Sequence, residues 1–281
     1  MKKNKQYAGR PVLALLLAAV FLLLALPIGA AEEADDGAMP VIDHCIGAYL
    51  YNFENDEVLF SVGTDERVYP TSTVKLMTGI VAIEELGDDL SRQVTITGEM
   101  LSKVAGNNVG LMAGEVVTVE QLLYSANDAA MVLAYAAGGS VEAFVDKMNE
   151  KANTLGAYKT YYANPTGMHN DAMVTTVADT AIIAKYAYTL PLFMEIVSTP
   201  KYVMEATNLS DYRNIYNRNC LLSKYYNVNY PYPRATGMNA GATTQGGYAI
   251  CATAEESSTG LSYLAIVMGA DEMDGAIYSY V

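Results

Sequence analysis

The sequence has few of the residues that build metal sites and disulfide frameworks. Its 281 residues include no tryptophan, three cysteines (Cys45, Cys220 and Cys251) and two histidines (His44 and His169). It contains no HExxH pattern and no paired CxxC, so it supports no metal site, and we expect no cofactor. Three cysteines allow at most one disulfide. Because Cys45 and Cys251 lie in apolar, strand-like segments, we expect them to be buried free thiols.

Basic residues are also scarce, with 17 Lys and Arg against 31 Asp and Glu, a formal net charge of −14. Four of the basic residues and none of the acidic ones lie in residues 1–31, so the remainder carries a formal charge of −18. Such a surface repels phosphate backbones, which argues against a nucleic-acid partner. The sequence indicates no obligate protein partner. Hydrophobic residues make up 52% of the chain, which is typical of a globular protein.

Long apolar runs are absent except for one near the N-terminus. Residues 12–26 are uninterruptedly apolar, follow a basic start, and precede a Pro and Gly break with Ala30 and Ala31 after it. This three-part pattern predicts a secretory signal peptide over residues 1–31, cleaved after one of those alanines, then an acidic leader over residues 32–44. An uncleaved membrane anchor is the alternative, although the run is shorter than the roughly 20 residues a spanning helix needs. We therefore expect an exported, extracytoplasmic protein.

The periodicity of apolar residues predicts strands at both ends of the chain and helices in the middle. Two strand-like runs joined by a turn predict a β-hairpin over residues 45–62. Helical spacing occurs at 74–86, 119–124, 129–137, 140–155 and 177–190, and further strands are expected at 94–97, 247–254 and 261–268. The Tyr- and Asn-rich residues 208–234 are expected to form a long surface connection. This order predicts an α+β fold with one antiparallel sheet built from both chain ends and a mainly helical subdomain.

The strongest candidate for chemistry is the pair Ser72 and Lys75, at the start of the predicted helix 74–86. Residues three apart on a helix share a face. A serine hydroxyl is a poor nucleophile until a base takes its proton, and a lysine can be that base if burial lowers its pKa. The same Ser-x-x-Lys spacing recurs at Ser198–Lys201, but there it contains a proline and no apolar helix follows. The sequence therefore favours the first copy.

A second candidate is Ser125-Ala126-Asn127, between two predicted helices. A hydroxyl and an amide on such a turn can relay a proton and bind a peptide carbonyl. Serine and asparagine are also ordinary helix-capping residues, so the triplet alone is weak.

In this order and spacing, the two motifs resemble those of penicillin-recognising serine enzymes, and more specifically the D-alanyl-D-alanine carboxypeptidases, or low-molecular-mass penicillin-binding proteins. The resemblance runs from about residue 48 to 270 and includes the segments 63–70, 109–114, 164–169 and 217–222. It implies a β-lactamase/transpeptidase-like fold over residues 45–281. It also implies that a peptidoglycan stem peptide acylates Ser72, and that β-lactams act as acylating inhibitors.

By the same resemblance, Lys75 is the base that takes the proton of Ser72, and Ser125 and Asn127 assist proton transfer and substrate binding. The oxyanion hole is expected to consist of the backbone N–H groups of Ser72 and Ala242.

The sequence departs from this family at the third motif, Lys-Thr-Gly. A gap-free alignment places Asn239-Ala240-Gly241 there, so the lysine that receives the substrate carboxylate is absent. Asn239, Gly241 and Ala242 are then the expected substrate-binding residues. A rival alignment that needs a gap places residues 235–237 at the motif and also lacks the lysine. Arg234 is one candidate replacement for the missing charge.

Two further departures concern length. The family has several more apolar residues between the positions of Tyr124 and Ser125, and it continues beyond the position of Val281, so the domain is expected to be truncated at its C-terminus. Together with the third motif, these departures leave open a catalytically impaired relative that binds the cell wall. A serine β-lactamase is less favoured, because the region around Asn164 lacks an acidic deacylation motif.

Overall fold

The computed structural model describes residues 44–87, 89–223 and 231–271. The expected signal peptide, nearly all of the acidic leader and the last ten residues lie outside this part of the chain. Within it, no single helix has the length and apolar composition needed to cross a bilayer.

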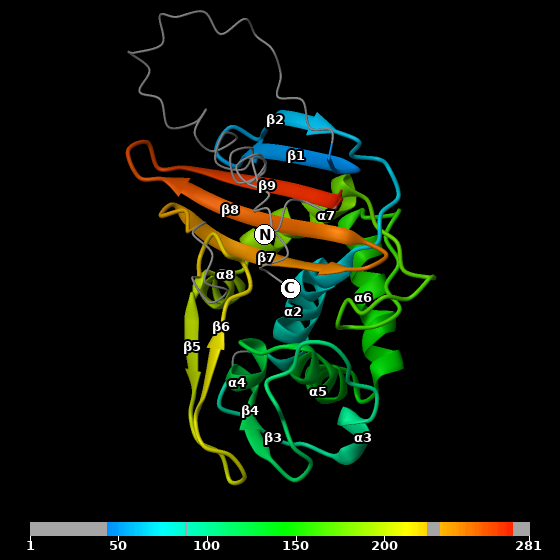
Figure 1. The fold of residues 1–281 in the computed structure, drawn as a ribbon, viewed down its shortest axis with the longest axis vertical. Helices are drawn as coiled ribbons and strands as arrows, with labels where there is room; N and C mark the ends of the chain where they lie inside the picture. Colours follow the sequence, from blue (N-terminus) through cyan, green and yellow to red (C-terminus); the bar gives the residue numbers. More distant parts are fainter. Residues whose placement is uncertain (1–43, 88, 224–230, 272–281) are drawn as a thin grey trace, which may run out of the picture.

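One five-stranded sheet forms one end of the molecule (Figure 1). Its strands are β1 (Gly47–Asn52), β2 (Glu57–Val62), β7 (Ala235–Thr243), β8 (Gly247–Glu256) and β9 (Leu261–Ala270), in the order β2-β1-β9-β8-β7. Every neighbouring pair is antiparallel, and β1 joins the two chain ends by pairing with β9, where Leu50 lies opposite Ala265. The expectation of one antiparallel sheet made from both ends of the chain is confirmed.

Helices cover one face of this sheet and fill the other end of the molecule. The helices are α2 (Val74–Leu86), α3 (Gly98–Leu101), α4 (Val119–Leu123), α5 (Asn127–Gly138), α6 (Val141–Leu155), α7 (Val177–Tyr188) and α8 (Pro191–Ser198). In Figure 1, α2 lies between the sheet and the smaller elements α3, α4 and α5. Most of α2 is buried, because its sequence is apolar on nearly every side. The helix that follows Ser72 therefore lies at the centre of the helical part of the molecule.

The helix starts follow the sequence closely. Ser140 caps α6 by accepting a hydrogen bond from the backbone N–H of Ala143. Thr118 and Gln121 form a capping box at the start of α4. These side chains satisfy backbone N–H groups that have no partner inside the helix, which fixes where each helix begins.

The expectation of a surface connection over residues 208–234 is wrong in part. Residues 213–216 form strand β6 (Arg213–Tyr216), which pairs antiparallel with β5 (Lys201–Met204). Cys220 and Leu221, a little further on, are buried against the outer face of the sheet. Polar, tyrosine-rich strands lack a clear alternation of apolar residues, so only the pairing with β5 reveals them. A second small sheet pairs β3 (Gln93–Thr95) with β4 (Val116–Thr118).

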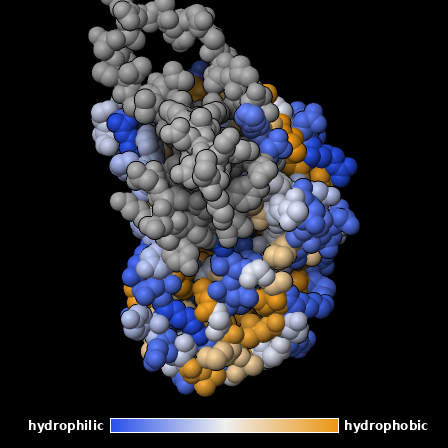
Figure 2. Space-filling model, viewed as in Figure 1, coloured by the Kyte–Doolittle hydropathy of each residue, from blue (hydrophilic) through white to orange (hydrophobic). Residues whose placement is uncertain are grey.

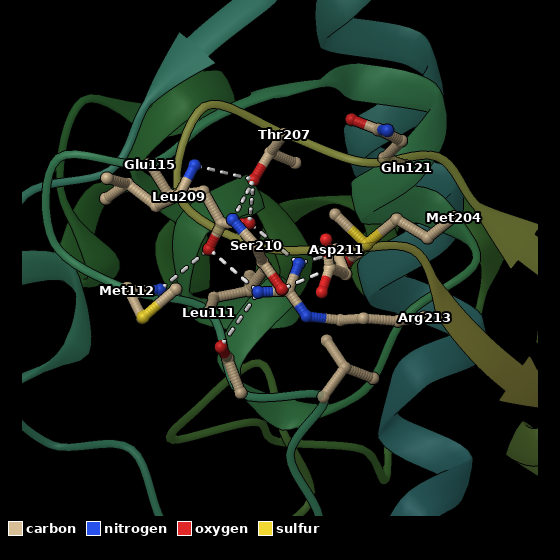
Figure 3. A network of polar contacts seen from close by, with 12 residues as sticks. Leu111, Met112, Glu115, Gln121, Met204, Thr207, Leu209, Ser210, Asp211 and Arg213 are labelled. Carbon is tan, nitrogen blue, oxygen red and sulfur yellow. Dashed lines mark hydrogen bonds and ion pairs between the residues drawn. The ribbon is translucent and has the colours of Figure 1, made fainter.

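A buried ion pair holds the β5–β6 hairpin against the β3–β4 region (Figure 3). Arg213 donates to both carboxylate oxygens of Glu115, at 2.7 and 3.1 Å, and Thr207 donates to the same carboxylate at 2.7 Å. The Glu115 side chain is fully buried, so the ion pair is shielded from water. In the lower part of Figure 2, hydrophobic residues reach the surface. In the hairpin itself, Val203 and Leu209 are exposed. The tip of the hairpin is exposed, whereas Met204 and Ile215 nearer its base are buried in the core, so the ion pair and apolar burial together hold the hairpin.

The three cysteines are free thiols. Cys251 and Cys220 are buried, whereas Cys45 is only partly covered. The expectation of free thiols is confirmed, and that of full burial holds for Cys251 but not for Cys45.

Candidate active site

Ser72 lies on a tight turn that leads directly into α2. The turn is a short 3-10 helix, η1 (Thr71–Thr73), and Thr71 has a positive φ of 49°. Gly167, on a distant loop, lies so close to the Thr71 carbonyl that a side chain at residue 167 would collide with it. A non-glycine residue in the left-handed region is strained, and such strain is often found at functional sites. The turn thus presents Ser72 at the start of a buried helix.

Strand β7 approaches this serine at Gly241. A Cβ atom added to Gly241 would lie 2.5 Å from the Ser72 Cβ and closer still to its Oγ. Only glycine leaves room for the serine side chain at this position of the strand. The contact supports the gap-free alignment, which places Gly241 at the glycine of the third motif, over the rival alignment of residues 235–237.

Lys75 lies one turn further along α2, with its ammonium group against the loop that contains Asn164. Its Nζ donates to the carbonyl oxygen of Thr166 at 2.6 Å. Asn164 shapes this loop, because its side-chain oxygen accepts from the backbone N–H groups of Thr166 and Gly167. Burial lowers the pKa of Lys75 from 10.5 to about 7, with a further lowering from the positive charge of Arg218. An amine with this pKa is substantially neutral near neutral pH and can accept a proton.

Ser125 and Asn127 lie where α4 gives way to α5. The Ser125 hydroxyl donates to the carbonyl of Gln121, at 3.0 Å, and so caps the end of α4. The buried side chain of Asn127 donates to the carbonyl of Ala105, at 2.9 Å. Among the hydrogen bonds between described residues, none joins Ser125 or Asn127 to Ser72 or Lys75. Their catalytic roles stay a prediction.

The remaining predicted residues lie along β7. Asn239 and Gly241 pair with Cys251 and Ala249 of β8, which belong to the core on the helix-covered face of the sheet. Asn239 therefore shares the face that meets Ser72, and its side-chain oxygen is buried without a hydrogen-bond partner. Ala242 follows Gly241 directly. In the described part of the chain β7 is an edge strand, and an edge strand can pair with an extended peptide through its backbone.

Arg234 does not replace the missing lysine in this structure. Its guanidinium forms an ion pair with the largely buried carboxylate of Glu256. Separating Arg234 from this carboxylate would leave a buried charge without its partner, which is energetically costly.

Two features near the site escaped the sequence reasoning. The rings of Tyr124 and Tyr202 stack at 4.1 Å, which ties the residue before Ser125 to strand β5. The carbonyl oxygen of Thr166 accepts a hydrogen bond from Lys75, although the sequence marks residues 164–169 only as a segment that resembles the family. Both are contacts between segments far apart in the chain, and a single sequence gives no pairing signal for them.

A cavity of about 850 Å³ lies beyond the end of β7. Its lining includes Tyr69, Ala242 and Gly246, together with the charged residues Arg67 and Asp171. The cavity therefore extends from the candidate oxyanion-hole residue Ala242 past the turn between β7 and β8. Among the residues that the structure describes, no group of three or more His, Cys, Asp or Glu side chains is arranged to hold a metal ion.

The chain is similar to known proteins in both sequence and fold. Residues 44–272 match the family model of the D-alanyl-D-alanine carboxypeptidases, peptidase family S11. The chain is 29% identical over 267 residues to the D-alanyl-D-alanine carboxypeptidase DacF of Bacillus subtilis, covering 92% of this chain and 66% of that protein, so it spans just under two thirds of that relative. It is 31% identical over 224 residues to DacB2 of Mycobacterium tuberculosis, covering 76% of this chain and 72% of that protein.

Solved structures show the same fold. A D-alanyl-D-alanine carboxypeptidase from Mycobacterium tuberculosis superposes with a TM-score of 0.75 at 26% identity, covering 87% of this chain and 90% of that one. The Streptomyces K15 DD-transpeptidase gives a TM-score of 0.74 at 25% identity, covering 86% of this chain and 95% of that one. The expected α+β, transpeptidase-like fold is confirmed, whereas the alternative of an impaired, non-catalytic relative gains no support from these comparisons. The chain belongs to the D-alanyl-D-alanine carboxypeptidase family of serine peptidases.

Proposed function

We propose that this chain is a serine D-alanyl-D-alanine carboxypeptidase that trims peptidoglycan stem peptides through an acyl-enzyme on Ser72. The proposal rests on one observation, that a candidate nucleophile, a candidate base and the strand β7 lie at the same place in the fold. Ser72 lies against Gly241 of β7, and Lys75, one turn along α2, has a pKa lowered to about 7. A nucleophile, a neutral base and an open strand edge are the parts that an acyl-transfer site requires.

In the proposed reaction, Lys75 takes the proton of the Ser72 hydroxyl as the oxygen attacks the carbonyl of the penultimate D-alanine. The bond to the terminal D-alanine breaks, and that residue leaves with a proton on its amino group. An ester on Ser72 remains, and water hydrolyses it to release the shortened peptide and restore the serine. The backbone N–H groups of Ser72 and Ala242 are the proposed donors to the negative oxygen that forms in each step.

The substrate binds, in this proposal, as an extended peptide along the open edge of β7. Backbone hydrogen bonds to an edge strand hold a peptide in register without regard to its side chains. Ala242 lies where the strand passes Ser72, and the cavity lined by Tyr69 and Arg67 begins there. The part of the stem peptide before the D-alanines would extend toward this cavity.

We further propose that the protein is exported and works at the cell wall. The support is the N-terminal sequence, in which a basic start, an apolar run and small residues follow one another. β-Lactams should act on the protein as acylating inhibitors, since they would leave a long-lived ester on Ser72.

The proposal is tested by labelling the purified protein with a fluorescent penicillin and by measuring release of D-alanine from a synthetic peptide ending in D-Ala-D-Ala. The Ser72→Ala variant is the matched control, and its fold is checked by circular dichroism. We expect labelling and D-alanine release that both vanish in the variant. A folded wild-type protein that is neither labelled nor active would overturn the proposal in favour of an impaired relative, the candidate that Asn239 at the third motif raises.

A further inference from the structure

The loop of residues 105–111, between α3 and β4, lies on the turn that carries Asn127. The side-chain Nδ2 of Asn127 donates to the carbonyl of Ala105, at 2.9 Å, and the backbone N–H of Asn127 donates to the carbonyl of Asn107, also at 2.9 Å. A carbonyl oxygen can accept only from the nitrogen end of a side-chain amide. The contact with Ala105 therefore sets how the Asn127 amide, the predicted substrate-binding group, is turned.

Asp128, the next residue, holds the middle of this loop. Its buried carboxylate accepts hydrogen bonds from the backbone N–H groups of Val109, at 3.1 and 3.2 Å, and of Leu111, at 3.0 Å. One of its oxygens also accepts from the backbone N–H of Ala129, at 3.1 Å. Hydrogen bonds to an ionised group are roughly twice as strong as neutral ones, and the first turn of a helix favours a negative charge. The carboxylate is thus a strong tie between the loop and the start of α5.

The loop is held against Asn127 by contacts of this kind rather than by burial. Residues 105–108 are exposed. Gly106 nevertheless lies between two side chains, since a Cβ atom there would lie 2.9 Å from Nδ2 of Asn127 and 2.8 Å from the sulfur of Met168. At the far end of the loop, Arg213 donates to the carbonyl of Gly110, at 3.1 Å. A shift of the loop would therefore move the acceptor of the Asn127 amide.

We propose that Asp128 is a positioning residue: by holding the 105–111 loop, it keeps the Asn127 amide in the orientation that binds the peptide carbonyl of the substrate. This inference rests on the proposed function and names a residue that holds the predicted substrate-binding group in place. Asp128 acts through the loop and Asn127, not on the reacting atoms. Its loss should therefore slow the reaction only as far as Asn127 contributes to it.

The test is a double-mutant cycle on the rate of acylation by a fluorescent penicillin. Asp128→Asn leaves one accepting oxygen in place of two, so a backbone N–H that the carboxylate accepts would face an NH₂ group instead. We expect acylation of this variant to be roughly ten- to a hundredfold slower than that of wild type, because small misplacements carry large kinetic costs. In the Asn127→Ala background, Asp128→Asn should cause little further loss, since the group that it positions is gone.

Asp179→Asn is the matched control for the loss of a buried acid. Asp179 is buried in the first turn of α7 and accepts from the backbone N–H of Lys159, at 2.7 Å. Its replacement should lower thermal stability, as Asp128→Asn should, but leave the acylation rate close to that of wild type. Circular dichroism of both variants, before and during heating, separates loss of stability from loss of rate.

A second variant tests the loop contact without changing a charge. Gly106→Ala places a methyl group against the Asn127 amide and should slow acylation, and the slowing should be smaller in the Asn127→Ala background. Gly139→Ala is its control, because Gly139 has the same φ of 78° but a Cβ there meets nothing within 4 Å. If Asp128→Asn does not fold, these two glycine variants decide the question, and equal acylation rates in them would overturn the inference.

The cycle has clear contrary outcomes. Losses from Asn127→Ala and Asp128→Asn that add in full would show that Asp128 does not act through Asn127. Equal slowing by Asp128→Asn and Asp179→Asn, or a wild-type rate in Asp128→Asn, would also refute the assignment. Failure of the proposed function is read separately, from wild-type protein that neither labels nor releases D-alanine, and it would remove the reaction that Asp128 serves.

Discussion

The ammonium group of Lys75 lies 2.6 Å from the carbonyl oxygen of Thr166, on a loop more than ninety residues away in the sequence. The same loop reaches the turn on the other side of the nucleophile. Its Gly167 packs on the carbonyl of Thr71, which precedes Ser72. One loop therefore contacts the candidate base and supports the turn that carries the candidate nucleophile.

The acylation rate should depend on pH through the lysine. Burial lowers the pKa of Lys75 to about 7, and only its neutral form can accept the serine proton. The second-order rate of penicillin labelling should therefore rise between about pH 6 and 8 and then level off. Labelling by Lys75→Met should be very slow at every pH. A rate that stays flat across this range, in a protein that labels well, would exclude Lys75 as the base.

Asn164 should affect the acylation rate through the loop that contacts Lys75. Its side-chain oxygen accepts hydrogen bonds from the backbone N–H groups of Thr166 and Gly167. Asn164→Ala should move the Thr166 carbonyl and slow acylation by on the order of a hundredfold, since small misplacements carry large kinetic costs. Asn164→Asp keeps the accepting oxygen and should lose less. Stopped-flow labelling of both variants, at matched thermal stability, checks this order, and equal losses would contradict it.

Gly241→Ala should block the nucleophile and leave the fold intact. An added Cβ would overlap the side chain of Ser72, whereas the backbone of β7 is ordinary extended strand at this residue. We expect a loss of labelling of about a hundredfold or more, by the same argument from misplacement. Gly98→Ala is the matched control, because a Cβ there meets nothing within 4 Å. Normal labelling of Gly241→Ala would show that the strand does not approach the serine this closely.

The buried pair of Glu115 and Arg213 should be needed for stability. Arg213→Met leaves a buried carboxylate without its cation, which costs about 3–5 kcal/mol in other proteins. The exposed pair of Lys159 and Asp65 is the control, and Lys159→Met should change the free energy of unfolding very little, because water screens exposed pairs. Urea unfolding monitored by circular dichroism measures both. Similarly small decreases in the free energy of unfolding in the two variants would show that the ion pair of Glu115 and Arg213 is not needed for stability.

The same pair predicts the direction of acid sensitivity. Burial raises the pKa of Glu115, but the hydrogen bonds from Arg213 and Thr207 outweigh it, so the pKa lies below its usual 4.5. Stabilisation by the carboxylate is therefore complete above about pH 4.5 and is lost as the pH falls through the lower, folded-state pKa. The stability difference between wild type and Arg213→Met should shrink over that acidic range.

Elements with local signals could be predicted from the sequence. The apolar run of α2 from Val74 to Leu86 and the capping box of Thr118 and Gln121 each predict an element within a few residues. The sequence also singled out Ser72 and Lys75 as candidates, because three-residue spacing at the start of a helix predicts that both share one face.

The contacts that these residues make could be learned only from the folded chain. Gly241 against Ser72, Thr166 against Lys75 and the ion pair of Glu115 with Arg213 all join segments separated by about ninety residues or more. Such contacts depend on how elements pack, and packing is set by the whole core rather than by local spacing. The pKa of Lys75 is likewise a property of burial and of a neighbouring charge, so its own segment of sequence does not determine it.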